Sequence, residues 1–441
     1  MRTRTFALAL MSAAMLVVTG VTPAQFLQHP PPPPPVLVEA AAMLNVHNGQ
    51  YVRPARILIE NGRIAAMGAN VTAPAGVKVL DLGNLTLLPG LIDTHVHMFL
   101  HPMAYGHAPD ESGQTIHESV PERTIIAVLQ AKLDLMAGFT SEKDMGTEGA
   151  GPADTALRQA INDGEIPGPR LWISGNAISM VGGHEAIYGY NPAILIPQNA
   201  DMVTGVTQML ETIRRQHYEG STFVKIYETG REYFHNGVFH ADYQFPEPVL
   251  AAAVKEAARL DTFVSVHDQG EPGTLYAAQA GVASIDHATQ LGPETMQLMI
   301  QKHIFAVPTF TVFIAFHSKA LGGPGGLDPM IEYKAQQFRK QLKAGVPIAM
   351  GSDVGPFPHG TQNQEFYWLV HFGMSPLGAI QAGTINAAEL LRDAKDLGSL
   401  DVGKYADIVG VNGDPLQNIK LLEHVQFVMK GGEVYKNGSA N

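Results

Sequence analysis

Cysteine is absent from this sequence of 441 residues, and charged residues make up only 16% of it. Without cysteine, disulfide bonds, thiolate zinc sites and cysteine nucleophiles are excluded, so a metal site would need histidine, carboxylate or modified lysine ligands. The formal net charge of -12 argues against nucleic acid or an anionic membrane surface as a partner. The sequence does contain 45% hydrophobic residues and 18 histidines, which allow a large core and a histidine-based metal site.

The first 24 residues have the features of an export signal. A start with two arginines precedes an apolar run over residues 6–21, and the segment 22–24 resembles a signal-peptidase site. The run is short for a membrane span, although a retained membrane anchor is the alternative interpretation. We therefore predict a signal peptide over residues 1–24, a Pro-rich spacer over 25–35, and no stable membrane insertion after signal removal. The predicted location is the periplasm or the medium of a bacterium.

Short strands and turns dominate both ends of the rest of the chain. Asn61-Gly62, a dipeptide typical of a hairpin turn, separates two segments of strand-like composition. Near the C-terminus, apolar segments with the turn signal Gly431-Gly432 show the same character. We therefore predict that residues 36–87 and 398–441 form one small β-sandwich, which the middle of the chain interrupts.

The middle of the chain alternates apolar runs with helical patterns, and the apolar residues of 122–137 recur at helical spacing. Eight short apolar runs are candidates for strands, and they cover residues 91–97, 139–143, 171–174, 223–227, 262–267, 283–287, 305–308 and 348–351. A closed parallel barrel needs eight strands that alternate with helices. We predict an α/β fold in which residues 88–397 form a (β/α)8 TIM-type barrel beside the β-sandwich.

Polar residues lie at the ends of several candidate strands, on the barrel face where active sites are built. His95 and His97 share one face of a strand, because side chains alternate along it, and two imidazoles there can chelate one metal ion. Lys225 lies within an apolar strand, where a buried amine is costly unless it is paired or modified. His267 and His287 end two consecutive strands. These positions predict a metal site.

Asp353 follows the apolar run at residues 348–351 and is the sixth candidate ligand. Each of the six also has a purely structural interpretation. The histidines could be polar residues of the barrel mouth, the lysine could extend out of the sheet edge, and the aspartate could cap a helix. The occurrence of all six at one face of one barrel favours the metal site.

These motifs resemble those of a known enzyme group over nearly the whole chain after residue 35. The resemblance to the full ligand series of the amidohydrolase superfamily is carried by residues 89–97, Lys225, His267, His287 and residues 351–353. The resemblance to the imidazolonepropionase-like branch is carried by residues 351–360, 386–390 and 398–407. That branch includes Xaa-Pro dipeptidases, related carboxypeptidases and ochratoxin-hydrolysing amidohydrolases.

The resemblance implies a binuclear metal centre with a modified lysine. His95 and His97 would bind the more buried metal ion, and His267 and His287 would bind the second. Lys225, carboxylated on its amine by carbon dioxide, would bridge both ions, because a carbamate is an anionic ligand whereas an ammonium group is repelled. Zinc is the default metal, with manganese, cobalt or iron as alternatives.

The resemblance also implies that Asp353 contacts the first ion and acts as the catalytic base and acid. Two ions about 3.5–4 Å apart activate one hydroxide and polarise a carbonyl group. The implied function is cleavage of an amide bond in a peptide-like or N-acyl amino-acid substrate by this metal-activated hydroxide. The enzyme would be of the dipeptidase, carboxypeptidase or ochratoxin A hydrolase type.

Four further residues are candidates for substrate contacts. His184, in a long loop, could hydrogen-bond a substrate carbonyl or an oxyanion, or be an exposed loop histidine. Tyr227 could donate to the tetrahedral oxygen, with an ordinary core aromatic as the alternative. Arg231 could clamp a substrate carboxylate or form a surface salt bridge. His359 could line the pocket or cap a helix.

Other functions are possible on the same scaffold. A lactone, cyclic imide or phosphotriester hydrolase would use the same metal site, whereas a mononuclear deaminase is disfavoured because the Lys225 strand indicates two metal ions. A non-catalytic binding relative is disfavoured because the chain keeps all six candidate ligands. We expect a small-molecule substrate as partner, and the resemblance also implies a homo-oligomer.

Overall fold

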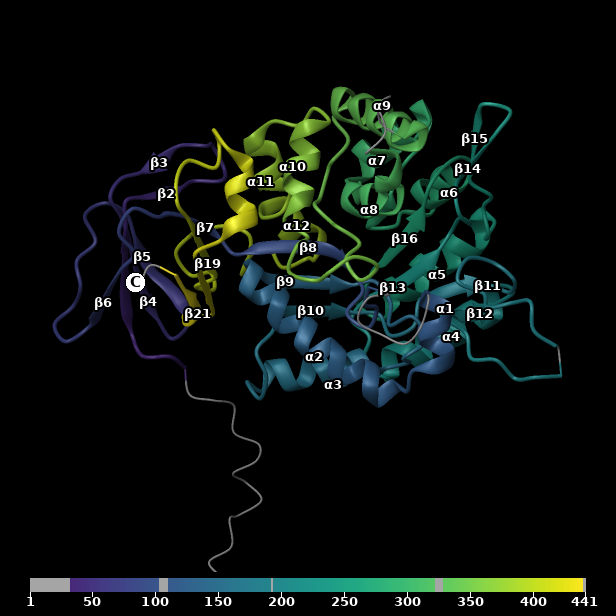
Figure 1. Ribbon diagram of the computed structural model, residues 1–441, viewed down its shortest axis with the longest axis horizontal. Coiled ribbons are helices and arrows are strands. Elements are labelled where there is room, and N and C mark those ends of the chain that lie inside the picture. Colours follow the sequence, from purple (N-terminus) through teal and green to yellow (C-terminus); the bar gives the residue numbers. More distant parts are fainter. Residues whose placement is uncertain (1–31, 103–109, 192, 322–327, 439–441) are drawn as a thin grey trace, which may run out of the picture.

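The computed structural model places a sandwich of two β-sheets beside a barrel of strands and helices (Figure 1). It describes residues 32–102, 110–191, 193–321 and 328–438. The predicted signal peptide and residues 25–31 of the predicted spacer lie outside this described part of the chain. Of the helices in the described part, none combines the length and the apolar character that a membrane crossing requires.

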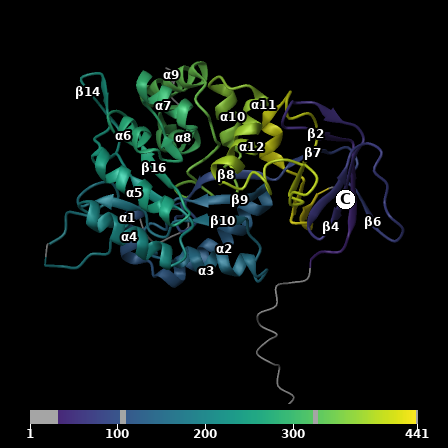
Figure 2. The ribbon, with the colours of Figure 1, turned by 180° about the vertical axis from the view of Figure 1, so that it is seen from behind.

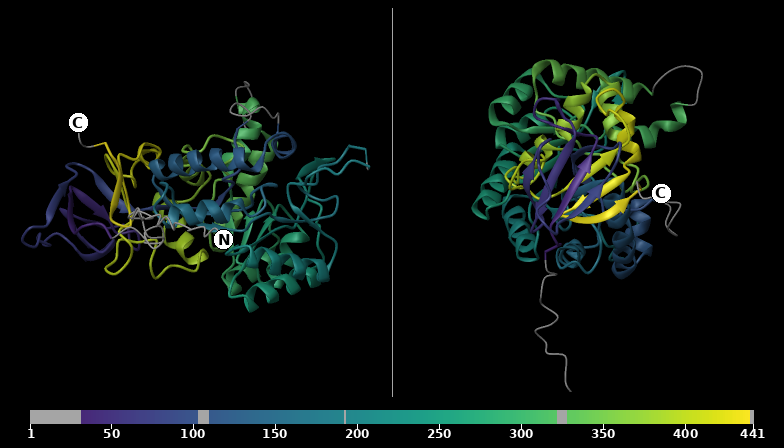
Figure 3. Two further views of the ribbon diagram at one scale, coloured as in Figure 1. Left: turned by 90° about the horizontal axis from the view of Figure 1, so that it is seen from below. Right: turned by 90° about the vertical axis from the view of Figure 1, so that its left-hand side faces the viewer.

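Strands from both chain ends build the sandwich, as predicted. One sheet has the order β5-β4-β1-β6 and consists of β1 (Val36–Ala40), β4 (Ala55–Glu60), β5 (Arg63–Met67) and β6 (Lys78–Asp81). The other has the order β21-β20-β19-β7-β2-β3 and consists of β2 (Ala42–Leu44), β3 (Tyr51–Val52), β7 (Thr86–Pro89), β19 (Ile408–Val411), β20 (Phe427–Lys430) and β21 (Glu433–Asn437). Since β7 pairs antiparallel with β19, with Leu88 opposite Val409, the two ends of the chain share one sheet (Figure 3).

An apolar core and a tight turn explain why these segments form the sandwich. The buried side chains between the sheets include Val38 and Ile57 from the first sheet and Phe427 from the second. Asn61-Gly62 reverses β4 into β5, and both residues have positive φ angles, of 52° and 74°. A two-residue hairpin turn of the primed type requires this conformation at both positions, which explains why asparagine and glycine stand there.

Seven parallel strands and one bridged segment form the barrel. The strands are β8 (Leu91–Val96), β9 (Phe139–Asp144), β10 (Arg170–Ile173), β13 (Val224–Tyr227), β16 (Val264–Asp268), β17 (Ser284–His287) and β18 (Phe305–Val307). Their register places Lys225 opposite Ser265 and His267 opposite Asp286. The gap between β10 and β13 is spanned by a hydrogen bond from the Thr222 amide to the Ile173 carbonyl, at 2.7 Å. The predicted α/β fold is therefore confirmed, and the arrangement of the strands is consistent with the predicted barrel.

The predicted eighth strand at residues 348–351 forms single bridges instead of a regular ladder. Ile348 pairs with Ala306, and the Thr94 amide donates to the Met350 carbonyl at 3.0 Å, so the segment still closes the barrel. The cause is the close approach of the segment to β8. A Cβ atom at Gly351 would lie 2.8 Å from the Cβ of His95, so only glycine fits there.

Helices surround the barrel strands, while the sandwich lies beside the barrel (Figure 2). They are α1 (Glu111–His117), α2 (Val120–Ala137), α3 (Ala153–Asn162), α4 (Val206–Tyr218), α5 (Glu247–Arg259), α6 (Gly273–Ala280), α7 (Pro293–Lys302), α8 (Phe310–Leu321), α9 (Pro329–Ala344), α10 (Gln364–His371), α11 (Pro376–Ala382), α12 (Ile385–Leu390) and the 3-10 helix Ile419–His424. The ends of α2 show why the sequence folds this way. Ser119 caps its first turn by accepting the Glu122 amide, and Gly138 ends it in the left-handed region.

Two additions extend the barrel at the end where the strands point. Short strands β11 (Ile178–Met180) and β12 (Asp201–Val203) extend the sheet beyond β13, and residues 182–191 and 193–200 between them belong to the long loop that contains His184. A hairpin of β14 (Tyr233–His235) and β15 (Val238–His240) follows β13. These additions carry several residues of the site described next.

Candidate active site and metal centre

The six predicted ligand side chains come together in one inner cavity of about 330 Å³. They come from the ends of β8, β13, β16 and β17 and from the segment that follows the bridged eighth position, and they are His95, His97, Lys225, His267, His287 and Asp353. A larger outer cavity of about 1020 Å³ adjoins it, since both are lined by His184, Glu185 and Arg231. The geometry therefore offers a deep polar site with a wide entrance.

The Asp353 carboxylate lies against three of the histidines. Its Oδ1 is 3.4 Å from Nε2 of His95 and 3.3 Å from Nε2 of His97, and its Oδ2 is 4.0 Å from Nδ1 of His287. Asp353 has a positive φ of 61°, which is uncommon for a residue with a Cβ and is held here by the hydrogen bond that its amide donates to the His95 carbonyl. One ligand atom each of His95, His287 and Asp353 lie within 4.8 Å of one another, close enough to hold a metal ion.

Neighbouring strands orient these histidines. Nδ1 of His95 donates to Asp286 at 2.9 Å, and Nδ1 of His97 donates to the Gly146 carbonyl at 3.0 Å. Nδ1 of His287 lies 2.7 Å from the Thr309 hydroxyl. An imidazole that donates from Nδ1 keeps the lone pair of Nε2 for a metal ion, the usual arrangement behind ligating histidines.

Two of the predicted ligands carry a buried nitrogen atom that lacks a hydrogen-bond partner among the described residues. They are the Lys225 amine and Nε2 of His267, and the Lys225 side chain is fully buried. Buried polar groups without a partner are rare in native proteins and call for a ligand. Burial lowers the pKa of the Lys225 amine, which favours the neutral form whose lone pair can attack carbon dioxide. Together with the imidazole nitrogens and the carboxylate of the other predicted ligands, these two nitrogen atoms form a donor set that suits divalent metal ions.

Charge is unevenly distributed over the ligand set. Burial lowers the pKa of His95 to about 4, so its imidazole is neutral at physiological pH. Burial also acts to lower the pKa of His97, but hydrogen bonding to Asp353 and the charge of Glu148 outweigh it and raise this pKa to about 9. A proton is therefore held between His97 and Asp353, and a metal cation bound there has to displace it.

His184 and Tyr227 lie at the edge of the inner cavity, where the sequence analysis expected substrate contacts. The ring centroid of His184 is 4.3 Å from that of His267 and 4.7 Å from that of Tyr227. Burial lowers the pKa of His184 to about 4, so the ring is a neutral donor. The Tyr227 hydroxyl donates to Glu148 at 2.6 Å, which fixes its direction.

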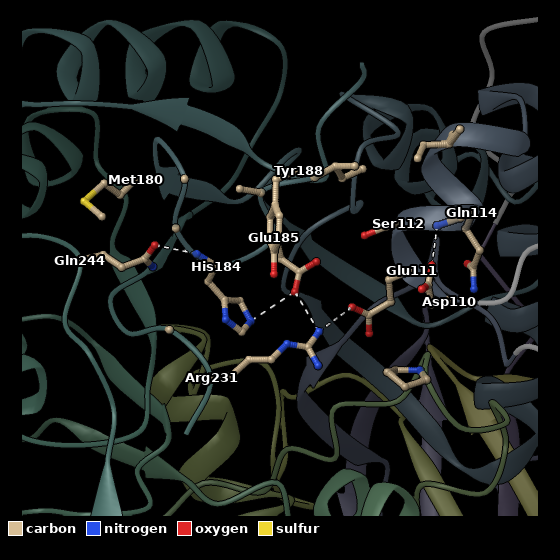
Figure 4. Close-up of a pocket in the computed structure, with 18 of the residues that line it drawn as sticks. Asp110, Glu111, Ser112, Gln114, Met180, His184, Glu185, Tyr188, Arg231 and Gln244 are labelled. Atoms are coloured by element: carbon tan, nitrogen blue, oxygen red, sulfur yellow. Dashed lines mark hydrogen bonds and ion pairs between the residues drawn. The ribbon is translucent and has the colours of Figure 1, made fainter. Parts of the chain in front are cut away.

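Arg231 projects into the cavities from the segment after β13 (Figure 4). One terminal nitrogen of its guanidinium lies 3.8 Å from Glu111 and 3.9 Å from Glu185, and its side chain is 76% exposed. This position allows contact with a substrate carboxylate. The negative charges of Glu111 and Glu185 would repel that carboxylate as it approaches.

His359 differs from the other predicted substrate contacts. It lines neither of the two cavities, because its side chain is buried against α2, with Nδ1 2.6 Å from the Asp134 carboxylate. Its Nε2 lies 3.3 Å from the His97 carbonyl. His359 therefore contacts the backbone of the metal-ligand residue His97 from outside the cavities, and its position does not support the predicted substrate contact.

Several residues that shape the site are not among those predicted from the sequence. Asp286 holds His95, Glu148 contacts both His97 and Tyr227, and Thr309 meets His287. The signal for Asp286 was present, since an aspartate within a short apolar run and directly before His287 requires a buried partner. Glu148 and Thr309 lie in loops whose sequences carry no comparable signal.

Comparisons with known proteins agree with this fold. A model described as the amidohydrolase family matches residues 86–436. The chain is 29% identical to ochratoxinase of Aspergillus niger, with 90% of this chain and 86% of that protein covered. It is 25% identical to imidazolonepropionase of Geobacillus kaustophilus, with 86% and 90% covered. The crystal structure of a Xaa-Pro dipeptidase with bound methionine in the active site has a TM-score of 0.80 and 29% identity, with 91% and 100% covered.

The fold and the site thus define a hydrolase built on a (β/α)8 barrel. The chain belongs to the amidohydrolase family, whose members are typically metal-dependent, and it is a hydrolase that acts on carbon–nitrogen bonds such as amides.

Proposed function

We propose that this protein uses a binuclear metal centre to cleave the amide bond of a peptide-like or N-acyl amino-acid substrate. It would release an amino acid with a free carboxylate, as a dipeptidase, a carboxypeptidase or an ochratoxin A hydrolase does. The observation that carries the proposal is the convergence of six ligand-type side chains on one cavity, with Lys225 and His267 left without a partner. The likeness to ochratoxinase and to a Xaa-Pro dipeptidase supports the same bond type.

His95, His97 and Asp353 would hold the first ion, His267 and His287 the second, and a carboxylated Lys225 would lie between them. The donor set suits zinc, which we propose as the metal. When bound, the two cations would polarise the scissile carbonyl and lower the pKa of the attacking water.

Three residues of the chain would serve the reaction directly. Asp353 would accept the proton of the attacking water and return it to the leaving amine, since its carboxylate faces the cavity. His184, a neutral imidazole, would donate a hydrogen bond to the oxygen that becomes negative, and Tyr227 would donate a second one once its single hydroxyl hydrogen turns from Glu148 to the substrate.

Arg231 would bind the carboxylate of the released amino acid. Its guanidinium lies in the part of the site that both cavities share, and it carries donors in the planar arrangement that suits a carboxylate. His359 would support the ligand strand through its contact with the His97 carbonyl.

The test is hydrolysis of a panel of substrates with and without added zinc. The panel contains N-acyl amino acids, Xaa-Pro and other dipeptides, ochratoxin A, a lactone and a phosphotriester. Metal-dependent amide cleavage is expected in the parent and should be lost in Lys225→Ala and Asp353→Asn. Lys255→Ala, which changes an exposed lysine of α5, is the matched control. Activity on the lactone or phosphotriester alone would replace the amide proposal, and absence of both activity and metal would indicate a binding protein.

Carboxylation of Lys225 is tested separately from activity. Protein prepared with ¹³C-labelled bicarbonate should show a carbamate signal by NMR, and Lys225→Ala should lack it. A parent spectrum without that signal, in protein that holds two metal ions, would contradict the bridging role.

We also propose export of the protein, with cleavage after residue 24, and a homo-oligomeric state. The domain boundaries at residues 36–87, 88–397 and 398–441 belong to the same set of proposals. N-terminal sequencing of secreted protein tests the export, and a sequence that still begins with Met1 would overturn it. Light scattering of the purified protein tests the oligomer, and a monomer mass would refute it.

A further inference from the structure

The inner cavity is acidic beyond its predicted metal ligands. Four glutamates line it, and they are Glu111, Glu148, Glu185 and Glu232. Within the described part of the chain, Arg231 is the one arginine that lines the cavity, and the other basic groups there, Lys225 and the histidines, belong to the predicted ligand set or, for His184, are neutral. One guanidinium therefore faces several carboxyl groups, and burial together with the charge of Glu185 raises the pKa of Glu111, as expected where the protein supplies too little positive charge to these groups.

The contacts of Arg231 do not satisfy these carboxylates. Its distances of 3.8 Å to Glu111 and 3.9 Å to Glu185 exceed the 2.7–3.2 Å typical of a hydrogen bond (Figure 4). Glu185 is fixed from the other side, because its Oε1 lies 3.2 Å from His184 and its Oε2 accepts from Asn199 at 2.7 Å. The carboxylate of Glu185 is thus held in place while its face toward the cavity is available to a ligand.

Glu148 supplies an independent observation that points to a ligand. Its side chain is buried, with 1% of the residue exposed, and it lines the inner cavity. One carboxylate oxygen accepts from Tyr227, while the other, Oε2, has no hydrogen-bond partner among the described residues. A buried carboxylate oxygen without a donor is costly, and a donor carried by a ligand would relieve the cost.

A substrate with only a carboxylate would bring one more anion into this group of glutamates. A substrate that also carries an ammonium group would supply three donors and a positive charge to the same carboxylates. We propose that Glu111, Glu148 and Glu185 form a subsite for the free α-ammonium group of the substrate. The preferred substrates are then unblocked dipeptides, which pair this ammonium with the carboxylate at Arg231. This inference rests on the proposed amide hydrolysis and selects among its substrates.

Two compounds that differ only in the ammonium group test the subsite. L-Alanyl-L-phenylalanine and N-propionyl-L-phenylalanine have the same scissile amide and the same leaving amino acid. The zinc-loaded parent should hydrolyse the dipeptide with a kcat/KM about tenfold or more above that of the propionyl compound, which corresponds to about 1.4 kcal/mol. The preference should decrease as salt is added, because the subsite acts through charge.

Charge-removing variants connect this preference with the named residues. Glu111→Gln is the first variant, since among the described contacts its carboxylate is paired only with Arg231. Glu185→Gln is the second, although it also loosens His184. Each should reduce the ratio of the two kcat/KM values about threefold or more. Glu211→Gln, which removes an exposed charge on α4, is the matched control and should keep the ratio.

A binding measurement separates this inference from the proposed function. Calorimetry with the zinc-loaded Asp353→Asn protein should show tighter binding of the dipeptide than of the propionyl compound. If neither compound is hydrolysed by the parent but the dipeptide still binds preferentially through Glu111, the proposed reaction fails and the subsite stands. Equal kcat/KM values, or a ratio that Glu111→Gln and Glu185→Gln leave unchanged, would overturn the subsite while amide hydrolysis stands. Binding of neither compound would overturn the subsite as well.

Discussion

The substitution Asp286→Asn tests whether the barrel holds His95 ready for a metal ion. Asp286 is buried on β17, and its Oδ2 lies 2.9 Å from Nδ1 of His95 on β8. Its Oδ1 accepts from Ser284 at 2.5 Å, and Oδ2 lies 3.7 Å from the Lys143 amine. Burial acts to raise the pKa of Asp286, but the charge of Lys143 and the hydrogen bond from His95 outweigh it and hold this pKa below its usual value. The group is therefore an anion behind the ligand at neutral pH.

The magnitude follows from what asparagine keeps and loses. Its amide oxygen still accepts from His95, but it carries no charge to strengthen the imidazole as a donor. Loss of such a partner typically lowers metal affinity about 10- to 100-fold, or about 1.4–2.7 kcal/mol. Stability falls too, because a buried cation that loses its partner costs about 3–5 kcal/mol. Burial lowers the pKa of Lys143 to about 8, so the amine can lose its proton, and the loss of stability should be smaller at pH 9 than at pH 7.

The assay is competition for zinc between the metal-free protein and a chromophoric chelator. Asp154→Asn is the matched control, since Asp154 is a buried carboxylate that accepts from the Gly175 amide at 2.7 Å, away from the predicted ligands. The control should bind zinc like the parent, while Asp286→Asn binds it at least about tenfold more weakly. Circular dichroism establishes that each variant is folded. A folded Asp286→Asn protein with the zinc affinity of the parent would refute the orienting role.

Three further predictions concern other parts of the molecule. In Gly183→Ala the new Cβ would overlap the Gln244 side-chain oxygen that accepts the His184 amide, so kcat/KM should fall about tenfold or more in steady-state assays. Burial lowers the pKa of Lys430 to about 8, below its value in the unfolded chain, so the parent loses stability as the pH falls from about 10 towards 8. Lys430→Met should remove about 2 kcal/mol of this pH dependence in denaturant titrations, and equal slopes would contradict it. Zinc binding at pH 8 should release protons, because His97 has a pKa of about 9 and must lose its proton to bind the ion. Calorimetry in buffers of different ionisation enthalpy measures this proton release, and binding heats that do not depend on the buffer would disprove it.

The sequence predicted those parts of the site that depend on strand parity. His95 and His97 are two residues apart, so any strand through them turns both side chains to one side, and both line the inner cavity. The same local reasoning placed Lys225 and His267, which end up on paired strands. Their common location follows from the barrel, because parallel strands end at one face.

The parts that escaped prediction depend on contacts between distant segments. Asp286 reaches His95 across 191 residues of sequence, and His359 meets Asp134 across 225. No local pattern encodes such pairs. Residues 348–351 have the composition of a strand, yet the crowding of Gly351 against β8 limits them to single bridges. Here tertiary packing overrides the local preference for a strand.

The orientation of the ligands couples the metal centre to closure of the barrel. His95 on β8 is held by β17, His97 by the loop after β9, and His287 by the residue two positions beyond β18. In each case the residue that orients the histidine belongs to a different segment of the chain. No single βα unit therefore contains both a histidine ligand and the partner that orients it. The site therefore forms only when the barrel closes, and metal ions that bind only the closed form must stabilise it by mass action. The eighth position of the barrel is held only by single bridges, so the bound ions should add most to its stability. In the proposed centre, Asp353 after that position shares one ion with His95 and His97.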